Sequence, residues 1–316
     1  MEDTAISRYE EIIRIRQKFP EVFFNDEIRD GFFIESKMKR AWAAQIEVLM
    51  EIDKICERNG IEYFAYGGTL LGAVRHKGFI PWDEDIDIAM RREDYQKFLG
   101  TAKKELPKGW RLMGAAQGDR FFFSRVVNGQ GYDSSAENLL RFHGCPYTVG
   151  VDIFPLDYLP SDREEEDVLY FLLRSIYSAI GAIKAGGKKE LEELLKLIEQ
   201  TCCVSIEREE KVEEQLCQLM DAIGMLYVDD RTDTLATLMF SPNPEVRMKY
   251  KREWVEKTVR LPFETIMIPV PANHHAVLEV QFGEGYMTPI RELPPDYPFY
   301  NKYEKELKKL NYEKKE

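Results

Sequence analysis

The sequence predicts an α+β fold in which a core of strands and helices is interrupted by a helical insert. The chain has 316 residues, 44% of them hydrophobic, enough for one large domain or for a core with a substantial insert. Strand-like segments occur between residues 61 and 154 and return near residue 259. Between residue 163 and about residue 238 the composition instead becomes rich in Glu, Lys and Leu with helical periodicity.

Periodicity and turn residues place the elements of the first half in order. Apolar side chains at helical spacing predict helices, and Gly or Asn marks their ends. Asn59-Gly60 is a C-terminal stop for the first helix, and Thr69 suits the N-cap of the second. The expected elements are a helix over 36–58, a strand over 61–66, a helix over 69–76, a strand over 85–90, a helix over 92–106, and strands over 110–113, 121–127 and 148–154.

The rest of the chain divides into a loop, an insert and a closing part. Residues 128–147 are expected to form a loop because Gly, Ser and Asn are frequent there. The insert is expected to hold about three helices with a break at Gly186-Gly187. The predicted domains are an N-terminal helical segment (1–58), a catalytic core (59–162), the insert (163–250), and the C-terminal part of the core (251–316). That last part should contain strands from about residue 259, a helix over 272–283, a proline-rich loop and a solvated helix or frayed tail.

Charge and hydropathy narrow the functional class. A net charge of -12 argues against a general nucleic-acid surface and favours metal cations, or anions that arrive with a metal. The N-terminus has no apolar signal-like region. The longest apolar run, 168–183, contains Arg174 and is too short to span a bilayer, so a buried amphipathic helix is favoured over a membrane-surface helix. We therefore expect a cytoplasmic protein without a transmembrane segment, with peripheral contact at the inner face of the membrane as an open alternative.

The cysteines predict reduced structural thiols. There are five, with no CxxC pair and none at ligand spacing from one of the four histidines. A disulfide framework and a zinc site are both disfavoured.

Asp85 and Asp87 are the sharpest chemical feature. In a strand, residues i and i+2 point to the same face, so the two carboxylates project together while Ile86 and Ile88 enter the core. Two carboxylates side by side are costly unless a cation lies between them. Oxygen ligands suit Mg²⁺ or Mn²⁺, with water and substrate phosphate in the remaining positions. The alternative is an exposed strand face or the acids of a helix N-terminus.

Two further features accompany this pair. Gly67-Gly68 ends a strand and begins a helix, where backbone N–H groups can bind phosphate, although most such pairs are simple turns. Asp152 lies between Val151 and Ile153 in an apolar strand and needs a partner or a cation, whereas Asp157 is expected to be a loop or capping residue. A Gly-Gly turn and two strands that carry such acids form the pattern of the nucleotidyltransferase fold.

These motifs carry a family resemblance. Residues 63–98 closely resemble the signature of the LicD family of phosphotransferases, which includes the fukutin-type enzymes. The similarity continues through Arg125 and residues 151–160 and resumes at 263–289. The resemblance implies a nucleotidyltransferase-like core, with a mixed sheet flanked by helices, that acts on a cytidine-diphospho donor. Bacterial LicD enzymes move phosphocholine from CDP-choline onto a glycan hydroxyl, and fukutin-type relatives move ribitol phosphate from CDP-ribitol.

The resemblance also implies a mechanism. Asp85 and Asp87 would hold Mg²⁺ (or Mn²⁺) against the donor's diphosphate. Asp152 would share the metal and take the proton from the attacking hydroxyl of a glycan or lipid-linked glycan, and CMP would leave. Alternatives are a CDP-ribitol or CDP-glycerol transferase, a nucleotidyltransferase that releases pyrophosphate, a metal-dependent glycosyltransferase, and a non-catalytic scaffold. The insert matches nothing in the family pattern, so the acceptor stays open.

Residues near the Gly-Gly turn form the predicted substrate- and phosphate-binding set. Backbone and hydroxyl donors, positive charges and one aromatic platform for a base or choline are the expected contributions. The alternatives are a solvated helix end for the basic triplet, a hydrophobic plug for the aromatic ring and a structural ion pair for the last arginine. The set is Gly67, Gly68, Thr69, Arg75, His76, Lys77, Trp82 and Arg125, with Asp83 and Glu84 at most in support.

Overall fold

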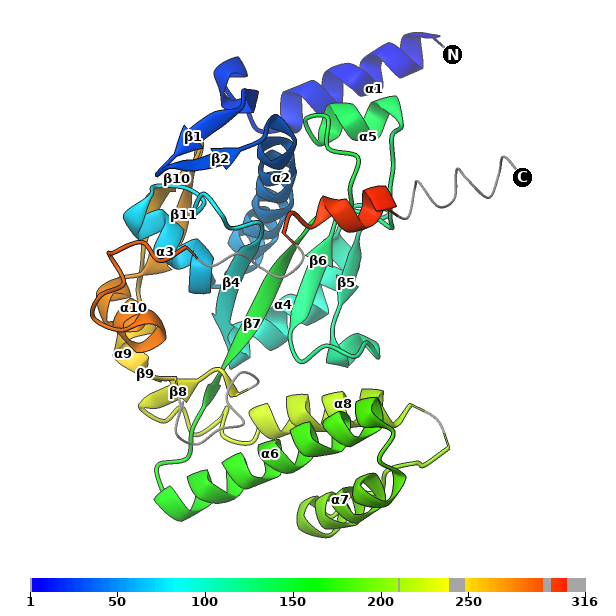
Figure 1. Cartoon of the computed structure of the whole chain (residues 1–316), viewed down its shortest axis with the longest axis vertical. Coiled ribbons are helices and arrows are strands. Elements are labelled where there is room, and N and C mark those ends of the chain that lie inside the picture. Colours follow the sequence, from blue (N-terminus) through cyan, green and yellow to red (C-terminus); the bar gives the residue numbers. More distant parts are fainter. Residues whose placement is uncertain (1, 210, 239–247, 292–296, 306–316) are drawn as a thin grey trace.

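A mixed β-sheet forms the centre of the molecule and confirms the α+β class (Figure 1). The computed structural model describes all residues except 1, 210, 239–247, 292–296 and 306–316. In the described chain the main sheet has the order β3-β4-β7-β6-β5, and in addition β8 pairs with β7 and β9 pairs with β8. The strands are β3 (Phe64–Ala65), β4 (Ile86–Arg91), β5 (Arg111–Met113), β6 (Ser124–Val127), β7 (Gly150–Tyr158), β8 (Thr234–Ala236) and β9 (Lys249–Lys251).

The register of three neighbouring strands positions the site. β4 and β7 run parallel, with Asp87 directly opposite Asp152. β6 runs antiparallel on the other side of β7, with Arg125 opposite Asp152. Because side chains of paired residues project to the same face of a sheet, two acids and an arginine meet near the beginning of β4 and β7.

Helices α2 (Ser36–Asn59) and α4 (Arg92–Glu105) pack near β4 and β7 and bury apolar faces against the sheet (Figure 1). Both match the expected ranges to within one residue. α2 ends because Gly60 adopts a left-handed φ of 56°, which glycine tolerates and which closes the helix with backbone bonds. The short helix α3 (Gly67–Arg75) connects β3 to the segment before β4.

Three local predictions differ from the structure. The strand expected over 61–66 is reduced to β3, and α3 begins at Gly67 with Tyr66 as the N-cap. Thr69 is therefore not a cap, because its hydroxyl accepts the backbone N–H of Asp87 at 2.8 Å. The predicted loop 128–147 contains α5 (Ala136–Arg141), whose N-cap Ser135 accepts the N–H of Asn138. A short helix of this kind has too few apolar residues for periodicity to reveal it.

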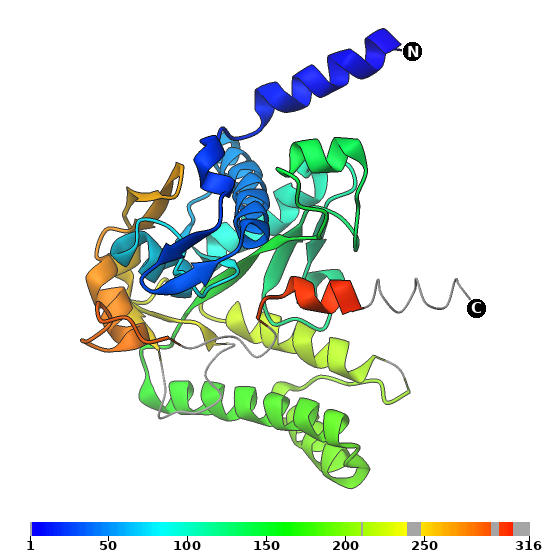
Figure 2. The ribbon, with the colours of Figure 1, turned by 45° about the horizontal axis from the view of Figure 1, so that its top comes forward.

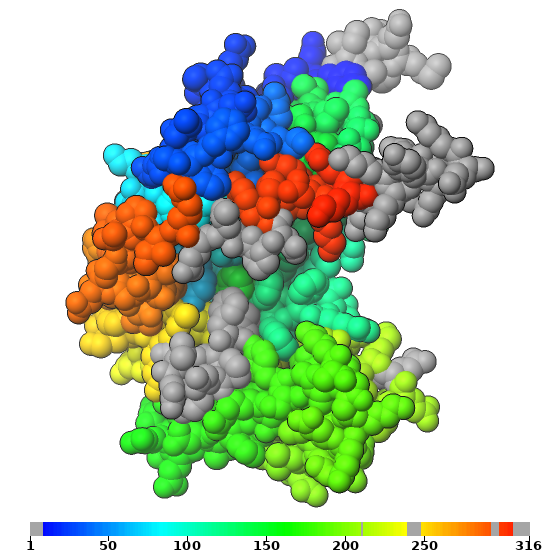
Figure 3. Space-filling model, viewed as in Figure 1, coloured from blue at the N-terminus to red at the C-terminus, as the bar shows by residue number. Residues whose placement is uncertain are grey.

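The insert contains three described helices and forms the lower lobe in Figures 1 and 3. They are α6 (Arg163–Ala185), α7 (Lys188–Cys202) and α8 (Val212–Gly224), and the predicted break between the first two falls at Gly186, with a φ of 73°. The chain then returns to the sheet through β8, so the predicted boundary at 250 lies inside β9. Residues 239–247 of the predicted insert lie outside the described residues.

α6 is longer than the apolar run 168–183 that predicted it. At 23 residues and a mean hydropathy of 1.4 in its most apolar window, it is long and apolar enough to cross a membrane by length and composition alone. Half of that window is buried inside the molecule, where α6 packs on α7 and α8. A helix in the core of a globular protein passes the same test of length and composition and is buried in the same way.

The two ends of the chain flank the sheet. The sequence predicts a helical N-terminal segment, but between α1 (Glu2–Ile15) and α2 the chain also forms a β-hairpin. The residues that form the hairpin do not continue the helical spacing of apolar side chains. Residues 300–305 are helical and lie in front of the sheet (Figure 2).

The five cysteines are free thiols. The remaining elements are η1 (Glu21–Phe24), β1 (Glu27–Arg29), β2 (Phe32–Ile34), η2 (Ala115–Gln117), α9 (Arg252–Val255), β10 (Thr258–Phe263), β11 (Ile266–Pro271) and α10 (His274–Phe282). Parts of the predicted proline-rich loop (292–296) and tail (306–316) are outside the described residues.

A buried arginine fastens the insert to the core. The Arg92 side chain is 2% exposed and pairs with Asp157 of β7 at 2.6 Å and with Asp221 of α8 at 2.5 Å. Asp157 is thus a strand residue with a charged partner, and its prediction as a loop or capping residue is wrong. A side chain at Gly224 would come within 2.4 Å of the Arg92 guanidinium, so α8 can approach this closely only with glycine there.

We predict that Arg92→Met lowers the free energy of unfolding by about 3–5 kcal/mol, because it leaves the buried Asp157 and the partly buried Asp221 without their cation. Urea unfolding followed by circular dichroism measures it. The control is Arg91→Met, which removes partly exposed pairs to Glu62 and Asp94 and should cost about 1 kcal/mol or less. Equal losses in the two variants would contradict this role of Arg92.

Candidate active site

Three carboxylates meet where β4 and β7 begin. Asp85, Asp87 and Asp152 each place an oxygen within 4.8 Å of the others. Asp85 and Asp87 are half-buried, and Asp152 is 8% exposed. Asp85 lies one residue before β4 and not inside it, as the predicted strand 85–90 implies, yet its carboxylate reaches the same cluster as Asp87, and the register with β7 supplies the third acid.

Burial and mutual repulsion raise the pKa values of Asp87 and Asp152 in this cluster. Burial raises the pKa of Asp152 to about 6, with Arg125 opposing the rise and Asp85 adding to it. Burial and then the charges of Asp85, Asp152 and Asp83 raise the pKa of Asp87 well above its ordinary value. The ionised cluster is therefore costly without a cation.

A divalent cation fits this donor set. The three groups offer only oxygen atoms, which Mg²⁺ and Mn²⁺ prefer. The Asp152 Oδ1 atom is buried and makes no hydrogen bond in the described structure, although Arg125 Nε lies 3.0 Å away as an ion-pair partner. That oxygen is paired with a charge but keeps lone pairs that a cation can use. The structure thus brings together Asp85, Asp87 and Asp152, the three residues that the sequence predicts as metal ligands.

The two glycines of the turn make room for carboxylates. A Cβ atom on Gly68 would lie 2.3 Å from Asp83 Oδ2, and one on Gly67 would lie 3.2 Å from Asp87 Oδ2. Gly67 also has a φ of 52°, which disfavours other residues. Asp83, expected to be at most a supporting residue, therefore lies against the N-terminal end of α3, where burial and then the neighbouring Asp85 raise its pKa well above the ordinary value.

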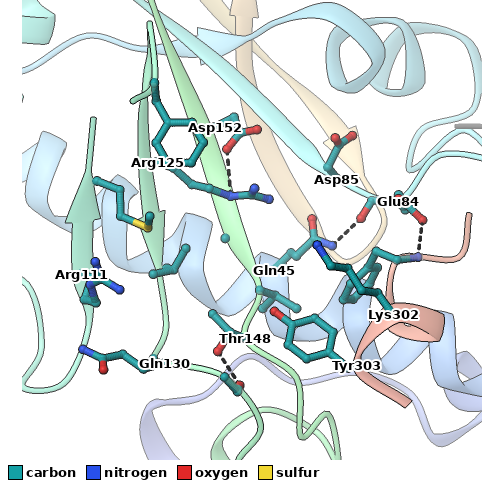
Figure 4. A pocket seen from close by; sticks show the side chains of 18 residues that line it. Gln45, Glu84, Asp85, Arg111, Arg125, Gln130, Thr148, Asp152, Lys302 and Tyr303 are labelled. Atoms are coloured by element: carbon teal, nitrogen blue, oxygen red, sulfur yellow. Dashed lines mark hydrogen bonds and ion pairs between the residues drawn. The ribbon is translucent and has the colours of Figure 1, made fainter. Parts of the chain in front are cut away.

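Two cavities flank the acids. The first, here called the sheet cavity, measures about 480 Å³ and is lined by Asp85, Asp152, Arg125 and neighbours from β5, β6 and the C-terminal helical stretch (Figure 4). The second, the α3 cavity, measures about 530 Å³ and is lined by Gly68, Asp83 and residues of α3 and the segment after α10. A substrate with groups on both sides of a reacting phosphorus could therefore span the acidic cluster.

The predicted binding residues divide between these cavities. Gly68, Arg75 and Trp82 line the α3 cavity, and Arg125 lines the sheet cavity. Arg75 donates from Nη1 to the carbonyl of Tyr286 at 2.7 Å, which holds its guanidinium at the cavity wall. Thr69 is 3% exposed and supports β4.

His76 and Lys77 line neither cavity. His76 Nε2 lies 3.1 Å from Asp30 Oδ2, and burial lowers the pKa of this histidine. The carbonyl of Lys77 accepts the N–H of Glu264, and its φ is 57°. The helix ends between Arg75 and His76, so the three cations diverge and only Arg75 faces the cavity.

Trp82 is mostly covered. It is 6% exposed, and its ring is contacted by Phe32, His76 and the guanidinium of Arg291, which lies 5.4 Å from the ring centre. One edge reaches the α3 cavity. This packing favours the hydrophobic-plug interpretation over an open platform for choline.

Sequence reasoning missed several residues of the sheet cavity. They are Gln45 of α2, Arg111 of β5, and Lys302 and Tyr303 near the C-terminus. Gln45 had a signal, because it is a polar residue on the apolar face of a helix whose neighbours are core residues. The others had none, since only the fold brings residues 111 and 302 beside Asp152.

Comparison with known proteins agrees with this geometry. Residues 60–165 match the domain family described as LicD/FKTN/FKRP, nucleotidyltransferase domain. The chain contains a LicD-type nucleotidyltransferase domain. The matched segment includes the three clustered acids and both glycines of the turn.

Curated relatives match over short segments. The chain is 54% identical over 54 residues to the lipopolysaccharide cholinephosphotransferase LicD of Haemophilus influenzae, which covers 17% of this chain and 20% of that protein. It is 36% identical over 66 residues to an uncharacterized protein of Rickettsia typhi, 21% of each. It is 48% identical over 40 residues to the human ribitol 5-phosphate transferase FKRP, 13% of this chain and 8% of that protein. The chain thus spans about a fifth or less of the length of these relatives.

We predict that Mg²⁺ or Mn²⁺ raises the melting temperature of the protein, because the ion offsets repulsion among the acids. Asp87→Asn should abolish this gain and raise the melting temperature of the metal-free protein. The gain should be smaller at pH 5 than at pH 7.5, because protons compete for carboxylates such as Asp152, whose pKa is about 6. Differential scanning fluorimetry measures all three effects. Asp233→Asn, a change at a 94% exposed carboxylate, is the control that should keep the full gain. The same gain in the Asp87→Asn protein would rule out this site.

We also predict that Gly68→Ala weakens the metal-dependent gain in melting temperature. The added methyl group would displace the Asp83 carboxylate and disturb the neighbouring Asp85. Gly100→Ala in α4 is the matched control, because no atom lies within 4 Å of its added Cβ. Unaltered metal stabilisation in Gly68→Ala would show that the close approach of Asp83 is unimportant.

Proposed function

We propose that this protein transfers a phospho-alcohol group from a CDP-linked donor to a hydroxyl of a cell-surface glycan or its lipid-linked precursor, with release of CMP. The observation that carries the proposal is the convergence of Asp85, Asp87 and Asp152 within a LicD-type domain. Phosphocholine from CDP-choline is the favoured group, because the similarity to the Haemophilus cholinephosphotransferase is longer and higher than the similarity to FKRP. CDP-ribitol and CDP-glycerol are the alternative donors.

The three acids are the proposed ligands of Mg²⁺ or Mn²⁺. When bound, such an ion supplies positive charge that offsets the charge on the donor's phosphates and on the leaving CMP. The exclusively oxygen donor set and the close approach of the three carboxylates support this assignment.

Asp152 is also the proposed general base. The acceptor oxygen attacks the phosphorus distal to cytidine, the bond from that phosphorus to the bridging oxygen of CMP breaks, and the hydroxyl proton passes to the Asp152 carboxylate. A carboxylate whose pKa is raised is a better proton acceptor than an ordinary one. Arg125, 3.0 Å from Asp152, holds this carboxylate and adds positive charge beside the reacting phosphate.

The donor's phosphates are proposed to approach from the α3 cavity. The N-terminal end of α3 at Gly68 carries a partial positive charge, and Arg75 adds a full one on the same wall. Positioning of the two reactants supplies much of the rate in phosphoryl transfer, since little covalent chemistry is required of the protein.

We predict that Asp152→Asn retains donor binding and loses turnover by about 100-fold or more, because the base is removed while the donor contacts remain. Thermal shifts with CDP-choline, CDP-ribitol, CDP-glycerol and CDP-ethanolamine, with and without Mg²⁺, identify the donor. Quantified CMP then gives the rate. Turnover equal to that of the native protein would remove Asp152 from the base role.

Product analysis separates the main alternative reaction. A nucleotidyltransferase that used the same acids would release pyrophosphate from a nucleoside triphosphate. Detection of pyrophosphate without CMP would therefore replace the proposed reaction. Absence of any stabilisation by a CDP-alcohol with Mg²⁺ would favour the scaffold alternative.

A further inference from the structure

The Gln45 side chain presents a buried oxygen that has no partner in the described structure. Gln45 lies on α2 and is 2% exposed. Its Nε2 donates to the carbonyl oxygen of Glu84 at 2.6 Å, while its Oε1 makes no hydrogen bond. The carbonyl can only accept, so the nitrogen must face it and the oxygen must face the other way. A buried amide oxygen without a partner destabilises the protein, and a bound donor group would remove that cost.

The unpartnered oxygen faces the sheet cavity. Figure 4 shows the Gln45 amide between Glu84 and Arg125, with its oxygen directed toward the space below Asp85 and Asp152. The fixed bond to Glu84 holds the amide in place, and Glu84 is itself fastened because its carboxylate accepts the N–H of Phe299 at 2.8 Å. The oxygen is therefore a preorganised acceptor beside the acids.

The other walls suit a polyhydroxylated ligand. Arg111, Lys302 and Arg125 offer N–H donors, and Tyr303 offers a ring (Figure 4). A volume of about 480 Å³ lies within the range of small-molecule sites and is sufficient for a sugar. Charged and amide side chains that alternate donors with acceptors match hydroxyl groups, which do both.

We infer that the sheet cavity is the acceptor subsite and that Gln45 Oε1 accepts a hydrogen bond from a hydroxyl of the sugar acceptor. The inference rests on the proposed function, because it uses Asp152 as the base that must reach the attacking hydroxyl. Asp152 lines the sheet cavity and does not line the α3 cavity, so the nucleophile belongs on the sheet side. Gln45 is then a binding residue that orients the acceptor for attack.

The amino group of the donor's cytosine is a less suitable partner for this oxygen. The base is separated from the reacting phosphorus by a ribose and a second phosphate. Gln45 is bonded to Glu84, the residue next to Asp85, and thus lies close to the reacting end of the donor. Loss of donor binding in a Gln45 variant would nevertheless reveal this alternative.

The test compares Gln45→Leu with Gln281→Leu. Gln281 is the matched control because its Nε2 is also bonded, to Tyr250 at 3.2 Å, its Oε1 is also buried without a partner, and it lines neither cavity. CMP release is followed with Mg²⁺ and CDP-choline against increasing galactose, glucose or N-acetylgalactosamine. Binding of CDP-choline is measured separately by thermal shift. If Gln45→Leu fails to fold by circular dichroism, Gln45→Met takes its place.

The inference predicts that Gln45→Leu raises the acceptor KM about tenfold or more, the loss expected for one buried hydrogen bond, with CDP-choline binding within about twofold of the native protein. Gln281→Leu should keep both values. An unchanged acceptor KM in Gln45→Leu overturns the inference. Weakened CDP-choline binding in Gln45→Leu, but not in Gln281→Leu, also overturns the inference and indicates that the donor occupies the sheet cavity.

Two results with the native protein separate this inference from the proposed function. A native protein that binds CDP-choline, but whose CMP release none of the three sugars accelerates, overturns the sugar assignment alone. A native protein that binds no CDP-alcohol overturns the proposed function and the inference with it.

Discussion

The pairing of β4 with β7 is the constraint on which the site depends. Ile86 and Ile88 of β4 and Val151 and Ile153 of β7 are all fully buried, and each contributes about 1.5–3 kcal/mol by leaving water. This burial fixes the register, and the register places Asp87 opposite Asp152. The core therefore imposes the repulsion between carboxylates that a bound cation can relieve.

The same constraint explains the close packing around the turn. Carboxylates forced toward α3 need space, and the chain provides it by omitting side chains at Gly67 and Gly68. The two glycines and the acids of the signature therefore depend on each other sterically, because a side chain at either glycine would crowd a carboxylate. In this structure the N-terminal end of α3 lies against Asp83 and Asp87, and Gly68 also lines the α3 cavity.

Segments far apart in the chain complete the surroundings of the acids. The backbone N–H of Phe299 donates a hydrogen bond to the Glu84 carboxylate, and Gln45 of α2 donates one to the Glu84 carbonyl. These contacts give the sheet cavity walls that the LicD-type segment, 60–165, does not itself contain. Most of the cavity wall lies within the matched segment, and Gln45, Phe299, Lys302 and Tyr303 complete it from outside that segment.

The sequence by itself determined the features that depend on neighbouring residues. The proximity of Asp85 and Asp87 follows from their i and i+2 positions, and the helix over 36–58 follows from its apolar spacing. Only the tertiary structure decided that Arg75 faces a cavity while His76 pairs with Asp30, and that the Gln45 oxygen is left without a partner. The reason is physical. Alternation and helical periodicity are local properties of the backbone, whereas the environment of a side chain is set by segments dozens to hundreds of residues away.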